Sequence, residues 1–578
     1  MPSPKETLST LFRAAIQSSY GIEMDPSIQP ASRPEFGDFQ ANFALRLAKQ
    51  LHKNPQEVAR ALVEKLNSGP VFNKLEVSGP GFINIHLSKQ FLAYHLEQLM
   101  QDSRLGVPRS SHPDTIVIDY GGANVAKEMH VGHLRSAIIG DAFVRLLSFI
   151  GHHVIRQNHL GDWGTQFGML IEYLAESNWQ NDHTHTYNDL NIYYKQAKQR
   201  FDTDETFANR ARARVVALQS GENESRAIWQ QLVDESKAHF QETYDRLQIL
   251  LTPADAVGES FYNDQLAILT SELIERGVAE IDQGAVVIFL EGFTDADGNR
   301  FPFLIRKQDG GYLYATTDLA ALYYRTQVLK ANRVFYVVDA RQRQHFAMLF
   351  AAGKKAFGLA DSIQLEHIAY GSVLGEDHKP LKTRSGDSIK LNELLTEAEK
   401  RAAEMVLQKH PDLTPDELAS IARNVGIGAL KYADLRADKI KDYVFSWEKM
   451  LAFEGNTGPY LQNAYVRILA IFRKGNIDPN DLPPFQIQLH EIMEHALAIK
   501  LSAFPDVIDT ISANLHIHSL CDYLYDVASH FHRFYEHCPV LSAADLNVRH
   551  SRIGLCALTA RTLARGLSLL GINVMDKM

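Results

Sequence analysis

The sequence contains little cysteine. Only three of its 578 residues are cysteines, Cys521, Cys538 and Cys556, and no two of them form a C-x-x-C pair. A disulfide framework or a thiolate zinc site needs more thiols at closer spacing. The three are therefore expected to be small, buried residues in a reducing compartment.

Long apolar runs are also absent. The chain has no uninterrupted apolar stretch of about 18 residues, the length that a membrane-spanning helix requires. The N-terminal segment has neither a long apolar core nor a small-residue cleavage site. Membrane spanning and secretion are therefore not expected, and a cytoplasmic location is.

A strong positive charge is missing too. The formal net charge is −10, so binding to nucleic acid would depend on local basic patches and not on a global field. Apolar residues make up 45% of the chain and charged residues 22%, as in an ordinary folded protein. A chain of 578 residues is too long for one core and predicts several domains.

A predicted strand-to-helix turn is the most informative stretch. "TIVIDY" (115–120) predicts a buried strand, and the segment from His133 to Gly151 has apolar residues at helical spacing. Between them lies "NVAKEMHVGH" (124–133). A second strand over 153–160 would complete a βαβ unit, which is typical of a parallel sheet.

Three interpretations of this turn are open. His130 and His133 could bind a metal, although helical zinc motifs usually place two histidines four residues apart with an acidic partner. They could be core histidines, which leaves the intervening Gly132 unexplained. An anion site fits the position at the carboxyl end of a strand, where a helix N-terminus offers free N–H groups. With Lys127 as a nearby cation, the two imidazoles then predict a triphosphate site.

The rest of the chain predicts an α/β fold, a doubly wound parallel sheet interrupted by insertions. Residues 5–66 are predicted to be mostly helical, and two strands flank Gly79-Pro80-Gly81 before a polar linker over 101–114. Further strands are expected over 284–293, 301–307, 311–318 and 333–339, with a helix starting at Asp318. From about 393 onward the pattern predicts helices alone.

Several motifs resemble one family. "HVGH" is similar to the H-I-G-H signature of class I aminoacyl-tRNA synthetases, and "ANVAKEMHVGHLRSAIIGD" (123–141) resembles that of arginyl-tRNA synthetases in particular. The segments "GDWGTQFG" (161–168), "GYLYATTD" (311–318), "KYADL" (431–435) and "FEGNTGPYLQNAYVR" (453–467) follow in the family's order. The resemblance implies ATP-dependent activation of arginine, followed by transfer to the terminal adenosine of its tRNA.

The resemblance also implies site residues. His130 and His133 would contact ATP phosphates, and Gly132 would lie under the adenine. The arginine pocket would be formed by Asp119, Asn124, Tyr314, Asp318 and Gln342. Carboxylates suit a guanidinium because they accept two parallel hydrogen bonds from it. For Asp318, a helix N-cap is an equally open interpretation.

The family's second signature, K-M-S-K-S, is degenerate here. The corresponding stretch is "HKPLKTRSGD" (378–387), in which Pro380 and Thr383 replace the two lysines. Lys382, Arg384 and Lys127 are the candidates for the cation that steadies the pyrophosphate. A solvated basic loop is the alternative for the first two.

For tRNA, the resemblance implies two contact regions. Phe82 and Asn84 match positions of the N-terminal module that stack on and hydrogen-bond an unpaired base, although Phe82 could be strand core. The C-terminal bundle resembles the family's anticodon-binding domain. Its candidate tRNA contacts are Tyr460, Arg467, Arg552, Arg561 and Arg565. A solvated helix face is the alternative for the last three.

The resemblance gives an expected domain division. It comprises an N-terminal α+β module (1–110), a split Rossmann-type catalytic domain (111–375, with insertions at about 170–250 and 259–311), a connecting region (376–450) and an all-α bundle (451–578). Magnesium is expected with ATP, no resident metal site is expected, and a monomer is the family's usual state. The rivals are a synthetase-like nucleotidyltransferase and a catalytically inactive RNA-binding paralogue.

Overall fold

The structure is a computed structural model that describes residues 2–66, 69–177, 187–295, 297–381, 389–479, 481–482 and 486–578. The chain divides into two compact units. One consists of Met1–Arg109, Leu451–Leu569 and Asn573–Met578, and the other of Ser110–Met450 and Leu570–Ile572. The predicted N-terminal module and C-terminal bundle thus belong to one unit, and the predicted catalytic and connecting regions belong to the other.

The second unit is built on a five-stranded, fully parallel sheet. Its strand order is β12-β11-β5-β6-β7, formed by β5 (Thr115–Asp119), β6 (His153–Leu160), β7 (Ala256–Gly258), β11 (Arg333–Tyr336) and β12 (Gln364–His367). The chain moves outward from β5 to β7 and then returns to the other side of β5. This reversal is the doubly wound order that was predicted, and ligands of such sheets bind where it occurs.

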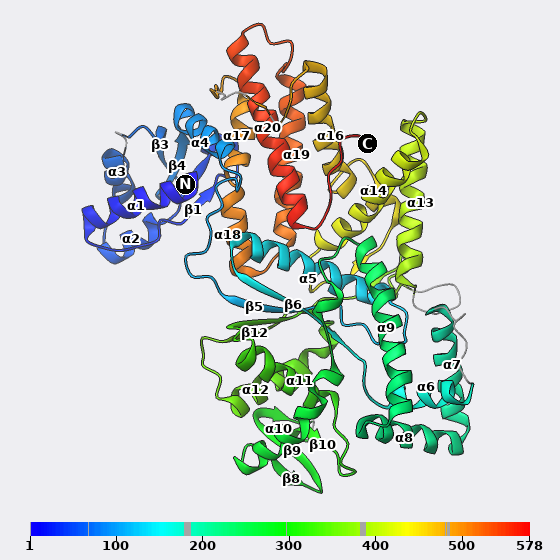
Figure 1. Cartoon of the computed structure of the whole chain (residues 1–578). Helices are drawn as coiled ribbons and strands as arrows, with labels where there is room; N and C mark the ends of the chain where they lie inside the picture. Colours follow the sequence, from blue (N-terminus) through cyan, green and yellow to red (C-terminus); the bar gives the residue numbers. More distant parts are fainter. Residues whose placement is uncertain are drawn as a thin grey trace. The chain divides into compact units, whose positions relative to one another are not determined.

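Helices cover both faces of the parallel sheet (Figure 1). α5 (Val131–Ile150) lies on one face, and α11 (Tyr314–Tyr323) and α12 (Arg343–Phe357) lie on the other. α5 begins after His130, whose backbone is extended, and ends at Gly151, whose φ of 107° suits a residue without a Cβ. The helix predicted from the apolar spacing is therefore confirmed.

Two insertions lie in the connections between strands of the parallel sheet. The helices α6 (Thr165–Glu176), α7 (Tyr187–Thr203), α8 (Glu205–Ser220) and α9 (Asn223–Arg246) lie between β6 and β7 in the chain. Between β7 and α11 come α10 (Asn263–Glu275) and an antiparallel sheet of β8 (Glu280–Asp282), β9 (Ala285–Thr294) and β10 (Arg300–Arg306). Because both insertions fall in crossovers, they leave the parallel ladder intact.

One predicted strand is a helix. The segment 311–318 was expected to be extended because tyrosine and threonine favour strands, but α11 already begins at Tyr314. Ala315, Leu319 and Ala320 lie at helical spacing and are buried in the core beside the sheet, so packing overrides the local preference. Asp318 lies inside this helix, and the N-cap residue is Leu313. The capping interpretation of Asp318 is therefore wrong.

A short strand pair that was not predicted links the end of the expected catalytic region to the connecting region. β13 (Val373–Leu374) pairs in parallel with β14 (Tyr443–Val444), beside α13 (Leu391–Lys409), α14 (Pro415–Leu435) and α15 (Trp447–Leu451). The expectation of helices alone after residue 393 is thus wrong at β14. Two residues are too few to show an alternating pattern.

The first unit joins a small sheet to a helical bundle. Its antiparallel sheet has the order β1-β2-β4-β3, formed by β1 (Ile28–Pro30), β2 (Phe39–Ala41), β3 (Phe72–Ser78) and β4 (Phe82–Leu87). The helices around it are α1 (Pro4–Tyr20), α2 (Ala44–Leu51), α3 (Pro55–Leu66) and α4 (Lys89–Gln101). β3 and β4 were predicted, whereas β1 and β2 lie in a region expected to be helical.

The bundle consists of α16 (Gly458–Gly475), α17 (Ile492–Ser502), α18 (Phe504–Asn514), α19 (His518–His537) and α20 (Leu546–Leu569). All three cysteines are buried in it, as expected for small core residues. Within the described ranges of the chain, no helix is both long enough and apolar enough to cross a bilayer.

Candidate active site

The turn before α5 arranges two imidazoles as neutral donors. The Gly132 N–H donates to His130 Nδ1 at 3.0 Å, and the His130 N–H donates to His133 Nδ1 at 3.1 Å. The ring centroids are 4.1 Å apart. Since each Nδ1 accepts a hydrogen bond, the proton of each neutral ring lies on Nε2, which can donate to an anion.

The surroundings keep both rings neutral. Burial, together with the charges of Arg341 and Lys127, lowers the pKa of His130. Burial and the neighbouring His130 lower the pKa of His133 to about 3. Lys127 is half-buried, with its ammonium 4.8 Å from the centroid of the Tyr194 ring. The site therefore offers two neutral donors and nearby cations, as a polyphosphate requires.

Gly132 is needed for packing inside the turn. A Cβ at this position would lie 2.8 Å from His130 Cε1, which is closer than van der Waals contact allows. Its expected position under an adenine stays a prediction. The glycine between the two histidines is explained by the hydrogen-bonded turn itself.

The first N–H groups of α5 are not free, contrary to expectation. The Val131 N–H donates to the Ile389 carbonyl at 3.0 Å, and the His133 N–H donates to the His130 carbonyl at 2.8 Å. The Gly132 N–H is bound to the His130 ring. Because all three donors have partners, a bound anion would be held by side chains and not by the bare helix terminus.

Residues 389–391 attach the degenerate loop to this turn. Besides the Val131 contact, the Leu391 N–H donates to the Met129 carbonyl at 2.8 Å. On the other side of the loop, the Leu381 N–H donates to the Val373 carbonyl of β13 at 3.0 Å. Lys382 and Arg384 lie outside the described residues, but both flanks of their loop are anchored in this unit.

Asp119 lies at the end of β5 and is already engaged. Its Oδ2 accepts a hydrogen bond from Arg325 Nη2 at 2.8 Å, and its Oδ1 accepts one from the His159 N–H at 3.2 Å. Arg325 is 1% exposed. A carboxylate has further lone pairs, so Asp119 can still accept from a ligand, but its position is fixed by the buried arginine.

Asp318 projects toward the same edge of the sheet from α11, between two histidines. His345 Nε2 is 2.6 Å from its Oδ2, and His159 Nε2 is 3.6 Å from its Oδ1. The Tyr314 ring is exposed, with its centroid 5.0 Å from that of His345. This aspartate therefore combines a fixed orientation with solvent access.

A carboxyl group that sequence reasoning missed lies nearby. Burial, Asp318 and Asp162 raise the pKa of Glu259 to about 8, against a hydrogen bond from the Trp163 backbone. Strong perturbation by burial and like charge is typical of functional carboxyls. No sequence motif pointed to Glu259, because it stands alone in the short connection after β7. Asn124 and Gln342, the other predicted pocket residues, are exposed.

In the first unit, Tyr460 and Arg467 belong to a cluster of rings and basic groups. The Tyr460 hydroxyl is 2.7 Å from His532 Nδ1, and its ring centroid is 5.5 Å from that of Tyr525. Arg467 is exposed on the same helix, α16, and its charge acts on both Tyr460 and His532. His532 and Tyr525 on α19 were not predicted, because their proximity to Tyr460 depends on helix packing.

The three predicted arginines of α20 are bound to other parts of the first unit. Arg552 is 7% exposed, and its Nε donates to the buried Glu494 at 2.7 Å. Arg561 Nη2 donates to the Asp102 carbonyl at 2.6 Å, and Arg565 Nη2 is 3.4 Å from the Ser103 carbonyl. These contacts favour structural roles, and the tRNA contacts of the three arginines stay predictions.

Phe82 and Asn84 lie on the face of β4 opposite its core residues Ile83 and Ile85. Phe82 is half-buried and is not part of the module's core cluster, so the strand-core alternative loses support. Asn84 is 4% exposed, and its Oδ1 accepts a hydrogen bond from Gln40 Nε2 at 2.7 Å. Phe82 is therefore the more accessible of the two predicted RNA contacts.

Known protein families match the N-terminal module, the parallel-sheet region and the C-terminal bundle. The family model "tRNA synthetases class I (R), catalytic domain" matches residues 95–447, and "Arginyl tRNA synthetase N terminal domain" matches residues 6–87. "DALR anticodon binding domain" matches residues 461–578. An arginine–tRNA ligase of Cellvibrio japonicus is 51% identical over 568 residues, which cover 98% of each chain. The chain belongs to the arginine–tRNA ligase family.

Other arginine–tRNA ligases agree over the whole length. The enzyme of Thermobifida fusca is 48% identical over 582 residues, with 100% of both chains covered. The crystal structure of the Plasmodium falciparum arginyl-tRNA synthetase is similar with a TM-score of 0.86 and 31% identity, again over 100% of both chains. The Thermus thermophilus enzyme, 24% identical with a TM-score of 0.82, shares the fold.

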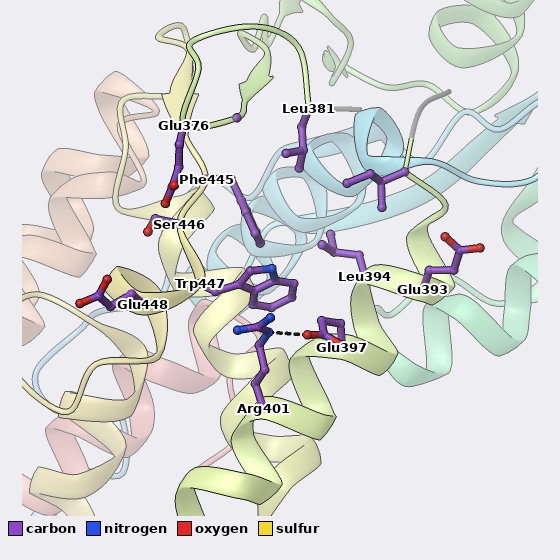
Figure 2. Close-up of a pocket in the computed structure, with 12 residues that line it drawn as sticks. Glu376, Leu381, Glu393, Leu394, Glu397, Arg401, Phe445, Ser446, Trp447 and Glu448 are labelled. Atoms are coloured by element: carbon purple, nitrogen blue, oxygen red, sulfur yellow. Dashed lines mark hydrogen bonds and ion pairs between the residues drawn. The ribbon is translucent and has the colours of Figure 1, made fainter. Parts of the chain in front are cut away.

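A cavity of about 560 Å³ lies in the second unit, beside α13 and α15 (Figure 2). Four glutamates line it: Glu376, Glu393, Glu397 and Glu448. Arg401 pairs with Glu397 at 2.5 Å, and its guanidinium lies 5.0 Å from the centroid of the Trp447 ring. The surplus of carboxylates disfavours a nucleotide in this cavity, and neither His130 nor His133 lines it.

Proposed function

We propose that the chain joins arginine to tRNA in two steps. The arginine carboxylate attacks the α-phosphorus of ATP, which releases pyrophosphate and forms arginyl-adenylate. The arginyl group then passes to the 3′-terminal adenosine of the tRNA. The observation that carries this proposal is the meeting of two kinds of group at one sheet edge: imidazoles suited to phosphate, and carboxyls suited to a guanidinium.

In the first step, His130 and His133 would donate from Nε2 to phosphate oxygens as negative charge develops. Their pKa values are lowered, so neither ring has to lose a proton before it acts as a neutral donor. Lys127, with Lys382 or Arg384 from the loop, would offset the charge of the departing pyrophosphate. Catalysis would rest on positioning and charge stabilisation, as phosphate chemistry commonly does.

Arginine would be recognised by Asp318 and Glu259. Asp318 is oriented by His345, and the guanidinium would be held between the two carboxyls in a geometry that an ammonium cannot match. Lysine would leave acceptors unpaired, at about 1–3 kcal/mol per group. Asp119, Asn124, Tyr314 and Gln342 would complete the pocket around the substrate's other groups.

Magnesium would enter with ATP. Among the described residues, no group of three or more histidine, cysteine, aspartate or glutamate side chains is arranged to hold a metal ion. Mg²⁺ is commonly held by substrate phosphates and water with few protein ligands, so we propose that ATP brings it.

The tRNA would contact the first unit. Phe82 offers a ring for an unpaired base, and the cluster around Tyr460 and Arg467 offers stacking surfaces with positive charge. A monomer in the cytoplasm is the working arrangement that we propose.

The test is arginine-dependent ATP–pyrophosphate exchange, with and without tRNA, and with lysine and citrulline as controls. Exchange with arginine alone among the three would support the reaction and its specificity. A requirement for tRNA would add the activation property expected from the family resemblance. No exchange in either condition would favour the inactive paralogue.

A further inference from the structure

The turn "GDWG" after β6 makes contacts that its sequence did not explain. Asp162 is 3% exposed, and its carboxylate accepts two hydrogen bonds from one residue. The Ser260 N–H donates to Oδ1 at 2.9 Å, and the Ser260 hydroxyl donates to Oδ2 at 2.6 Å. The buried Asp162 carboxylate thus holds the segment that follows β7 through its two hydrogen bonds with Ser260.

The same carboxylate rests against the backbone of Gly258. In the parallel ladder between β6 and β7, Leu160 is paired with Gly258. A Cβ on Gly258 would lie 2.0 Å from Asp162 Oδ2, which leaves no room for any side chain at this position. Asp162 therefore contacts the residues on both sides of Glu259.

Glu259 is thus enclosed by the GDWG turn. The Asp162 side chain fixes Gly258 and Ser260, the residues on either side of Glu259. A hydrogen bond from the Trp163 backbone reaches the Glu259 carboxyl itself. The field of Asp318 acts on this carboxyl as well. The clamp therefore fixes the backbone on both sides of Glu259, and with it the position of the Glu259 carboxyl.

The turn has support of its own. The Trp229 Nε1–H donates to the Asp162 carbonyl at 2.8 Å, and the rings of Trp163 and Trp229 meet edge to face at 5.6 Å. On its other side, the Val125 N–H donates to the Gly161 carbonyl at 3.1 Å. Asp162 is therefore held rigidly before it binds Ser260.

We propose that Asp162 is a positioning residue for substrate recognition: by clamping Gly258 and Ser260, it holds the Glu259 carboxyl in place and so sets the affinity for a guanidinium. The inference rests on the proposed role of Glu259 as a ligand of arginine. It assigns a role to the GDWG turn that acts through Glu259 and not through contact with the substrate.

The experiment is a double-mutant cycle in the full-length protein. Asp162→Ala, Glu259→Gln and the double variant are compared in tRNA charging, with KM for arginine, KM for ATP and kcat measured separately. Misplacement of a binding group by about 1 Å can cost on the order of a hundredfold. We therefore expect Asp162→Ala to raise the arginine KM about tenfold to a hundredfold, with the ATP KM within about twofold.

The double variant carries the decisive result. If Asp162 acts through Glu259, Asp162→Ala adds no further increase in the arginine KM when Glu259 is already Gln. An additive increase, or equal effects on the KM values of arginine and ATP, would overturn the positioning role. An unchanged arginine KM in Glu259→Gln alone would instead overturn the proposed function of Glu259.

Two further variants guard against a general loss of structure. Ser260→Ala removes one of the two clamp bonds and should raise the arginine KM in the same direction by a smaller factor, even if Asp162→Ala does not fold. Glu417→Ala is a control at an exposed carboxylate, since Glu417 also accepts an N–H and a hydroxyl hydrogen bond from one residue, Thr414 at the start of α14. A similar rise in the arginine KM in the control would overturn the inference.

Discussion

At the edge of the parallel sheet, the Asp318 side chain has two histidine partners and is 19% exposed, whereas the Arg552 side chain on α20 has a buried carboxylate partner and is 9% exposed. Both residues were singled out as candidate contacts for a ligand. The first can still accept hydrogen bonds from solvent, and the second has its charge compensated inside the protein. A charged side chain at a motif position can thus bind a ligand only if the fold leaves some of its hydrogen-bonding atoms exposed and does not pair its charge inside the protein.

The largest expected effect concerns the sheet edge. His133→Ala removes a preorganised donor at the phosphates, which typically costs about 10²–10³-fold in rate. We expect the rate of arginine-dependent ATP–pyrophosphate exchange to fall by this factor, with tRNA binding little changed. His153→Ala, an exposed histidine on β6, is the control. An exchange rate equal to that of the parent protein would remove His133 from the site.

The next largest effect concerns α20. Arg552→Ala leaves the carboxylate of Glu494 buried without its ion-pair partner, and the loss of one member of a buried pair typically costs about 3–5 kcal/mol. We expect a clearly lower free energy of unfolding in denaturant titrations. Unchanged stability together with weaker tRNA binding would reverse the comparison and make Arg552 an RNA contact.

The pH dependence of the arginine KM should report the ionisation of Glu259 at the edge of the parallel sheet. Because the pKa of Glu259 is raised to about 8, the free site holds a proton at pH 7 and loses it when a guanidinium binds. The arginine KM should therefore fall as pH rises toward 8, by up to about tenfold per unit. Glu259→Gln should flatten the profile, and a slope that persists in this variant would assign it to another group.

The same raised pKa predicts a stability trend of opposite sign. A carboxyl whose folded pKa exceeds its unfolded value favours the folded state when protonated. That contribution is lost as pH rises from the ordinary value of 4.5 through about 8. In the free protein, thermal melts of parent and Glu259→Gln should diverge in this window, with the variant relatively more stable at the alkaline end.

The smallest effects concern RNA contacts. Loss of a base-stacking ring typically costs about 1–3 kcal/mol of binding, so Phe82→Ala should weaken tRNA binding with stability nearly unchanged. Ile83→Ala is the matched control, because Ile83 is fully buried and its truncation should lower stability instead. Equal losses of stability in Phe82→Ala and Ile83→Ala would place Phe82 in the core.

For Arg467→Ala, we expect weaker tRNA binding. The slope of the logarithm of the binding constant against the logarithm of the salt concentration should be reduced by about 1.

Much of the catalytic fold could be predicted from local pattern. The apolar runs of β5 and β6, the helix between them and its terminal glycine obey periodicities that neighbouring residues impose on each other. The errors came where packing opposes local preference. The tyrosines and threonines of 311–318 favour a strand, yet the buried alanines of α11 pack as a helix.

The sequence by itself determined which residues carry the chemistry of the turn, since the order of His130, Gly132 and His133 produces the nested hydrogen bonds between them. Only the tertiary structure decided which charges remain available. It paired the Val131 N–H at the start of α5 with the Ile389 carbonyl, enclosed Glu259 within the GDWG turn and compensated the charge of Arg552 with Glu494. The physical reason is that hydrogen bonding along a turn is local, whereas desolvation and charge pairing depend on residues that are distant in sequence and meet only when the chain packs.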